Sequence, residues 1–212
     1  MFYFVIQSSL KMDSKNYLKD ISDIKNLMNK SSKFISLSGL SGVLAGIYAL
    51  IGASYFYFTV EIPKSSVHLT KGTMNTIAII LLIIGFLSAT TSIFFTSKRA
   101  KKINENPWNP ATKNLLNSFL MPLCIGLIFV IILFFQENYT HLIALILLFY
   151  GVSLINCERN TSNIIKPLGV LQVISGILCT IYYEHSFWFF TIGFGIVHLI
   201  YGTFIFFKYD NK

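Results

Sequence analysis

The side chains that could do chemistry in this 212-residue chain are a few polar groups set in long apolar stretches. His198 could accept a proton, bind a substrate or ligate a metal, and Gln172 could hydrogen-bond a small polar solute. Because a polar group in hydrocarbon is costly, such residues usually face the interior of a helix bundle or a water-filled cavity. The candidate intramembrane polar site consists of Gln172, His198, Asn156 and Tyr201, and Tyr48 and Tyr150 carry two further hydroxyl groups.

The surroundings of these residues argue against several kinds of chemistry. No Asp or Glu lies inside any of the apolar stretches, which disfavours a carboxylate proton relay. For His198, a structural hydrogen bond to a facing helix is the simplest role, and a substrate or proton site is the alternative. The other three histidines fall at separate places without the spacing of metal ligands: His68, His141 and His185. We predict no metal, no cofactor and no catalytic constellation, and therefore no enzyme activity.

Small residues accompany the two central polar residues. A glycine precedes Gln172 by three residues and another follows it by four, and His198 is flanked by glycines at the same spacing. Such small-residue patterns let helix backbones approach closely. We expect the first, fifth and sixth apolar helices to pack on one another with Gln172 and His198 turned inward; the alternative is a chance match. The predicted packing residues are Ser38, Gly42, Gly46, Gly169, Gly176, Gly195 and Gly202.

The composition indicates which elements must position these residues. Hydrophobic residues make up 54% of the chain and charged residues only 12%, and the mean hydropathy is +0.63. Soluble domains carry about 25% charged residues, so a soluble enzyme, a disordered chain and a disulfide scaffold are excluded. We expect an all-α polytopic membrane bundle over residues 34–207, because six apolar runs approach the roughly 20 residues that cross a bilayer. The predicted transmembrane helices are residues 34–60, 74–96, 114–135, 140–157, 163–183 and 187–207.

Residues at the helix boundaries carry capping signals. Asn109 before Pro110 predicts an N-cap followed by proline in the first turn of a helix. Thr140 and Ser186 could cap the fourth and sixth helices. Pro122 falls inside the third helix, where proline should kink it.

Positive charge alternates strongly between the predicted loops. Of the 17 Lys and Arg residues, 15 lie in the N-terminal segment, the second and fourth loops and the tail, and only Lys64 and Lys71 lie on the other side. Cytoplasmic loops are rich in Lys and Arg, so both termini should be cytoplasmic in a plasma membrane. The net charge of +8 then reflects orientation and attraction to anionic lipid at the cytoplasmic face, and nucleic-acid binding is not expected.

The N-terminal segment differs from the rest of the chain. Residues 13–33 place Tyr17, Ile21, Ile24 and Met28 on one face of a helix, with lysines and aspartates opposite. This predicts a short amphipathic helix on the cytoplasmic membrane surface, or alternatively a helix that docks a protein partner. Residues 1–12 form a possible start-site extension, because Met12 could be the true start, and residues 208–212 form a cytoplasmic tail.

Two stretches, residues 31–52 and 192–202, are distinctive in sequence. Both resemble an uncharacterised family of bacterial six-helix integral membrane proteins with an amphipathic N-terminal helix. The resemblance implies a bacterial inner membrane location. It implies no activity and no functional residues, since the family has no assigned activity.

Two classes of function fit these features. The first is a structural, regulatory or partner-binding membrane protein, with a homo-oligomer as one form of it. The alternative is a small-solute transporter or channel with Gln172 and His198 in the bundle interior. A dry interior favours the first class and a wet interior favours the second.

Overall fold

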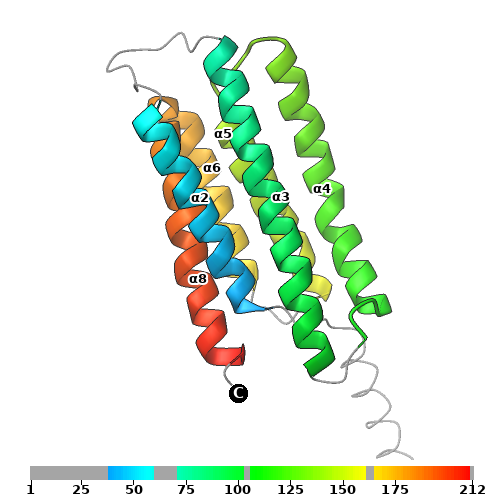
Figure 1. The fold of residues 1–212 in the computed structure, drawn as a ribbon. Helices are drawn as coiled ribbons and strands as arrows, with labels where there is room; N and C mark the ends of the chain where they lie inside the picture. The colour runs from blue at the N-terminus through cyan, green and yellow to red at the C-terminus, as the bar shows by residue number, and fades with distance from the viewer. Residues whose placement is uncertain (1–37, 60–70, 103–105, 161–164, 211–212) are drawn as a thin grey trace, which may run out of the picture.

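The computed structural model describes residues 38–59, 71–102, 106–160 and 165–210. Within these ranges the fold is helical without any β-strand (Figure 1). The first part contains α2 (Gly39–Thr59), α3 (Lys71–Lys102), α4 (Pro110–Phe135), α5 (Leu142–Asn156), the 3-10 turn η1 (Cys157–Asn160) and α6 (Lys166–Ile181). The last part is a nearly continuous helical rod of η2 (Tyr183–His185), α7 (Ser186–Phe190), η3 (Thr191–Val197), α8 (His198–Ile205) and η4 (Phe206–Asp210).

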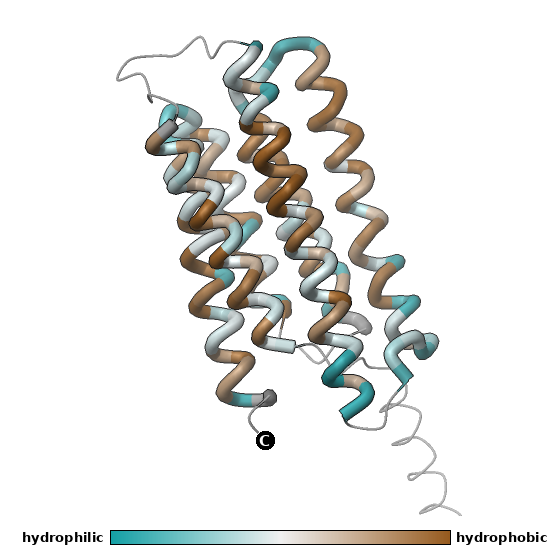
Figure 2. The backbone as a smooth tube through the Cα atoms, in the orientation of Figure 1, coloured by the Kyte–Doolittle hydropathy of each residue, from teal (hydrophilic) through white to brown (hydrophobic). Residues whose placement is uncertain are grey.

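Four of these helical segments are long and apolar enough to cross a membrane, which indicates a membrane protein. They are Gly39–Phe58, Lys71–Lys102, Pro110–Phe135 and Tyr183–Lys208. The apolar helices α5 and α6 have 15 and 16 residues, fewer than the roughly 20 that span a bilayer core alone. Figure 2 shows hydrophobic residues along the middle turns of α3 and α4 and hydrophilic residues at the lower end of α3. The predicted all-helical class is thus confirmed, with four candidate spans.

The helices pack in two groups. α2 lies along α8 and η3, and α3 lies on the other side of α2 (Figure 1). α5 and α6 form the closest pair, and α4 packs mainly against α5. An ion pair of 2.8 Å between Lys71 and Glu137 joins the start of α3 to the turn after α4. Because both side chains are exposed, water screens this pair and it adds little to stability.

The structure tests several boundary predictions. The Asn109 side chain accepts a hydrogen bond of 2.8 Å from the Thr112 backbone N–H, which confirms the predicted N-cap of α4. The predicted cap at Thr140 is wrong, because α5 begins after His141 and has no side-chain cap. The Ser186 hydroxyl donates to the Tyr183 carbonyl instead of capping the next helix. α4 continues through Pro122 as one helix.

Some predictions concern residues that the structure does not describe. The start-site extension, the surface helix at 13–33 and the first four residues of the predicted span 34–60 lie outside the described residues. At the other terminus, the helical rod continues to Asp210, into the predicted tail. The basic C-terminal turn of α3 lies at the same end of the bundle as the C-terminus (Figure 1).

Glycines on α2 and α8 allow the backbones of these two helices to touch. A β-carbon at Gly42 would lie 3.2 Å from the Gly202 Cα atom. A β-carbon at Gly46 would lie 2.8 Å from the Gly195 carbonyl oxygen and 2.9 Å from the Leu199 backbone nitrogen. Backbone atoms cannot move aside cheaply, so this interface requires glycine. Ser38 is buried just before α2 begins.

The glycines of α6 face a different helix from the one expected. A β-carbon at Gly169 would lie 2.9 Å from the Gly151 carbonyl oxygen on α5, and one at Gly176 would lie 2.8 Å from the Leu148 nitrogen. The expected packing of the three glycine-bearing helices is therefore found only in part: α2 meets the C-terminal rod through glycines, whereas α6 meets the rod through Gln172 and turns its glycines toward α5. Small-residue spacing predicts a close approach, but it does not identify the partner, and Gly151 on α5 provides the matching gap.

Replacing Gly46 by Leu should destabilise the folded protein by about 3 kcal/mol, because the new side chain meets backbone atoms of Gly195 and Leu199 in the C-terminal rod. The matched control is Gly85→Leu on α3, where a β-carbon would meet nothing within 4 Å. Thermal unfolding in detergent measures both variants. An unfolding temperature of Gly46→Leu equal to that of Gly85→Leu would contradict the assigned α2–α8 contact.

Candidate functional site

Four residues from different elements form a buried polar cluster: Tyr150 of α5, Gln172 of α6, Gly193 of η3 and His198 of α8. The Gly193 carbonyl oxygen lies 2.7 Å from Gln172 Nε2 and 2.9 Å from His198 Nδ1. The Tyr150 hydroxyl lies 2.9 Å from His198 Nε2. These contacts join α5, α6 and the C-terminal rod. We call these four residues the polar cluster.

The π-helical segment η3 makes this geometry possible. In a π-helix the hydrogen bonds run from residue i to i+5, and such segments often mark functional sites or places where a side chain enters the helical ladder. Here the His198 side chain returns to the carbonyl five residues before it. A β-carbon at Gly193 would lie 3.0 Å from Gln172 Oε1 and 2.8 Å from Leu147 Cδ2. Glycine at this position therefore lets the Gln172 amide reach the helix backbone.

The contacts assign the protonation of the imidazole ring. A carbonyl oxygen only accepts, so His198 Nδ1 must carry the hydrogen that bonds Gly193. In the neutral ring, His198 Nε2 is then the acceptor, and Tyr150 donates to it. The 3.4 Å approach of Gln172 Nε2 to His198 Nδ1 brings together two donors that share one carbonyl, so it is not a hydrogen bond.

Apolar side chains enclose the polar cluster. Gln172 and Leu147 are 0% exposed and His198 is 5% exposed. The Phe194 ring stacks on the imidazole at 18°, with 5.7 Å between ring centroids, and also lies 5.1 Å from the Tyr150 ring. The cluster thus lies in a packed region where unpaired polar atoms would be costly, which explains why its donors converge on one carbonyl.

One atom of the cluster remains without a partner. Gln172 Oε1 is buried and accepts no hydrogen bond from the described residues. Its neighbour Nε2 is held by the Gly193 carbonyl, so rotation of the amide would bring two oxygens together. The Gln172 oxygen is therefore a fixed acceptor inside the bundle.

The four residues predicted from sequence do not all meet. Gln172 and His198 come together. Asn156 is exposed at the end of α5 and donates a 2.7 Å hydrogen bond to the Ser118 carbonyl of α4. Tyr201 packs beside an apolar group with Leu154, Ile165 and Leu168. The expectation that Asn156 belongs to an interior polar site is therefore wrong, since it links α5 to α4 near the helix ends.

Tyr150 was predicted as an intramembrane hydroxyl but not as part of the site, and Gly193 was not predicted. The hydroxyl of Tyr150 is 48 positions from His198, and no periodicity connects them. A signal for Gly193 was present, because it lies five residues before His198, but the α-helical period does not place these two residues together. The predicted pattern used Gly195 instead, which packs against Leu50 of α2.

The chemistry open to the polar cluster is limited. Tyr150, His198 and Gly193 form a donor–acceptor chain that ends at a backbone carbonyl, which cannot pass a proton onward. Among the described residues, no three His, Cys, Asp or Glu side chains gather as a metal site requires. The cluster can hold helices together or present one acceptor to a neutral donor.

No protein-family model, curated protein or solved structure matches this chain.

The hydrogen bond between Tyr150 and His198 should couple the effects of changes at the two residues. In a double-mutant cycle of Tyr150→Phe and His198→Leu, we expect a coupling energy of about 1 kcal/mol, as for other hydrogen bonds between membrane helices. Unfolding in detergent with increasing denaturant measures it. The same cycle with Tyr48→Phe is the control, because Tyr48 lies on α2 and has no hydrogen bond to His198. Equal, near-zero coupling in both cycles would refute the contact.

Proposed function

We propose that this chain is a structural or partner-binding protein of the membrane, built around a packed core, and not a protein with a solute path. The observation that carries this proposal is the polar cluster. The Tyr150 hydroxyl bonds to the imidazole of His198, and the imidazole and the Gln172 amide nitrogen both bond to the Gly193 carbonyl. Leu147 and Phe194 pack against these groups. A solute path would need polar groups facing water.

Six spans and cytoplasmic termini form part of this proposal. α5 and α6 lie within the same bundle as the four longer helices, and their close pairing supports their crossing the bilayer together. The start of α2 and the C-terminus lie at one end of the bundle (Figure 1), as an even number of spans requires. The excess of Lys and Arg on that side supports a cytoplasmic assignment. The sequence resemblance supports a bacterial inner membrane.

Gln172 Oε1 favours one alternative function. A buried acceptor without a partner is costly, and a small neutral solute with an O–H or N–H group would satisfy it. This is the alternative of a small-solute transporter or channel with Gln172 and His198 in the bundle interior. It requires water and solute to reach Gln172 from at least one side of the membrane.

Water access to the core separates the two functions. In a variant in which Cys124, Cys157 and Cys179 are replaced, single cysteines are placed at positions 172 and 153. Ser153 is 0% exposed, so a cysteine there also reports on the core. Because serine to cysteine is a small change, this variant still tests water access if Gln172→Cys does not fold. A membrane-impermeant thiol reagent is then added to intact and to inverted vesicles. We expect no labelling of either cysteine from either side.

Lys101→Cys is the positive control, because Lys101 is exposed at the basic end of α3. It should be labelled from one side only, which also determines the orientation. Labelling at position 172 or 153 in a protein that still migrates as a single folded species would show a wet path. That result would overturn the proposal in favour of the transporter.

A further inference from the structure

The last turns of α3 form a groove with an unusual order of side chains. It is lined by Thr90, Ile93, Phe94, Ser97, Lys98 and Lys101, which we call the α3 groove. Steps of three and four residues place all six on one face of the helix. Along this face the chemistry changes from apolar rings and methyl groups, with hydroxyl groups beside them, to two ammonium groups.

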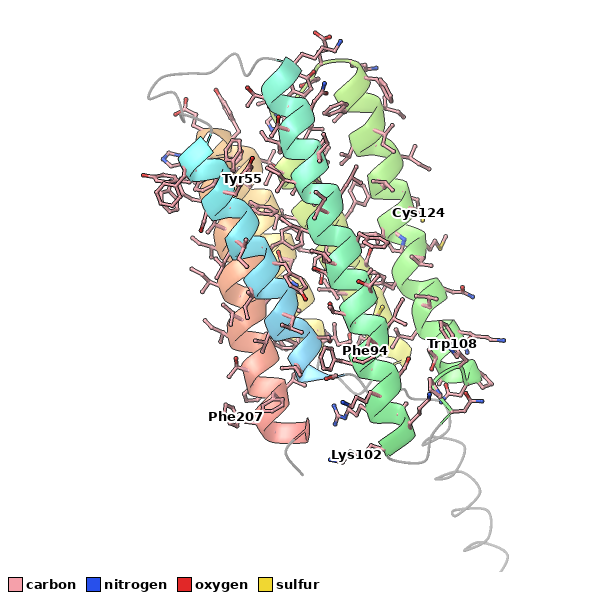
Figure 3. The ribbon with its side chains drawn as sticks, viewed as in Figure 1. Tyr55, Phe94, Lys102, Trp108, Cys124 and Phe207 are labelled. Carbon is pink, nitrogen blue, oxygen red and sulfur yellow. The ribbon has the colours of Figure 1, made fainter. Side chains whose placement is uncertain are left out.

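This order matches the cross-section of a membrane interface. Ile93 is 56% exposed and Phe94 is 61% exposed. α3 has 32 residues, so it is about 48 Å long, which exceeds a hydrocarbon core of about 30 Å. Figure 3 places Phe94 above Lys102 on α3, at the same end of the bundle as Trp108. The groove therefore passes from the depth of acyl chains to the depth of head groups.

The positive charge of the α3 groove is not neutralised within the described part of the chain. Neither Lys98 nor Lys101 forms an ion pair there. Glu158 pairs with Lys166 at 3.0 Å, and Glu137 and Glu184 belong to the opposite end of the bundle. A ligand for this groove must therefore be anionic at one end and apolar at the other.

We propose that the α3 groove binds one anionic phospholipid, with its phosphate between the ammonium groups of Lys98 and Lys101. The acyl chain lies against Ile93 and Phe94, and the hydroxyl of Ser97 lies between the two regions. This inference depends on the membrane placement proposed above but not on whether the bundle core is dry. Failure of lipid binding and labelling of the core are therefore separate results.

The test counts lipids retained by the full-length protein after detergent removal, by native mass spectrometry with added dioleoylphosphatidylglycerol or dioleoylphosphatidylcholine. We expect the wild type to retain the anionic lipid preferentially. Lys98→Gln with Lys101→Gln should lower that retention about 10- to 30-fold, because each lysine near an anionic surface changes binding about fivefold. Since the groove is exposed, the variant should unfold at the wild-type temperature.

The matched control removes two charges elsewhere at the same end, by Lys113→Gln with Lys208→Gln. It should change retention by less than about threefold, since a diffuse field falls off within about 10 Å. Phe94→Ala should weaken lipid retention without changing competition by inorganic phosphate, which distinguishes a phospholipid from a free anion. Equal losses in both double variants, equal retention of the two lipids, or full displacement by millimolar phosphate would each overturn the proposal.

Discussion

Backbone and side-chain polar groups within a bilayer must find their partners inside the protein, and here this constraint centres on the carbonyl oxygen of Gly193. The amide nitrogen of Gln172 and the Nδ1 atom of His198 both bond to it. Tyr150 then satisfies the other nitrogen of the imidazole. One irregular turn in the C-terminal rod thus connects to α5 and α6 through two hydrogen bonds, and a third, from His198 to Gly193, lies within the rod. Exchanging Tyr150 or His198 for an apolar residue leaves the other one with a polar atom that has lost its hydrogen-bond partner.

The polar cluster joins two groups of helices, and each group is itself held together by other contacts. α2 and the rod touch through Gly42, Gly46 and Gly202, and α5 and α6 touch through Gly151 and Gly169. Such backbone contacts depend on dispersion and shape, without a hydrophobic driving force inside lipid. The hydrogen bonds of the cluster run from one group to the other. Together with apolar contacts between the groups, such as Phe194 against the Tyr150 ring, they orient the groups relative to one another. The helices α3 and α4 remain at the edges with apolar faces directed outward.

Local signals made part of this structure predictable from sequence. Apolar runs of sufficient length indicated the helices, and Asn109 before Pro110 indicated a cap that forms as expected. Gln172 and His198 were identified as interior because polar groups in apolar runs seldom face lipid. The partners of these residues depend on contacts distant in sequence, such as Tyr150 with His198 and Gly169 with Gly151. No periodicity encodes such contacts, and the π-helical register that brings Gly193 to His198 departs from the α-helical spacing on which the prediction relied.

The tautomer of His198 tests the central claim most directly, because it reports the hydrogen bonds of the polar cluster without altering them. Protein with ¹⁵N-labelled histidine in lipid bilayers gives imidazole nitrogen signals, and a His198→Gln variant assigns them. The geometry predicts a neutral ring at neutral pH with hydrogen on Nδ1 and an unprotonated Nε2 that accepts from Tyr150. In Tyr150→Phe, the Nε2 signal should shift and the Nδ1 signal should remain. Hydrogen on Nε2 alone would contradict the assignment of Gly193 as the shared acceptor, and a doubly protonated ring would contradict the donation from Tyr150 to Nε2.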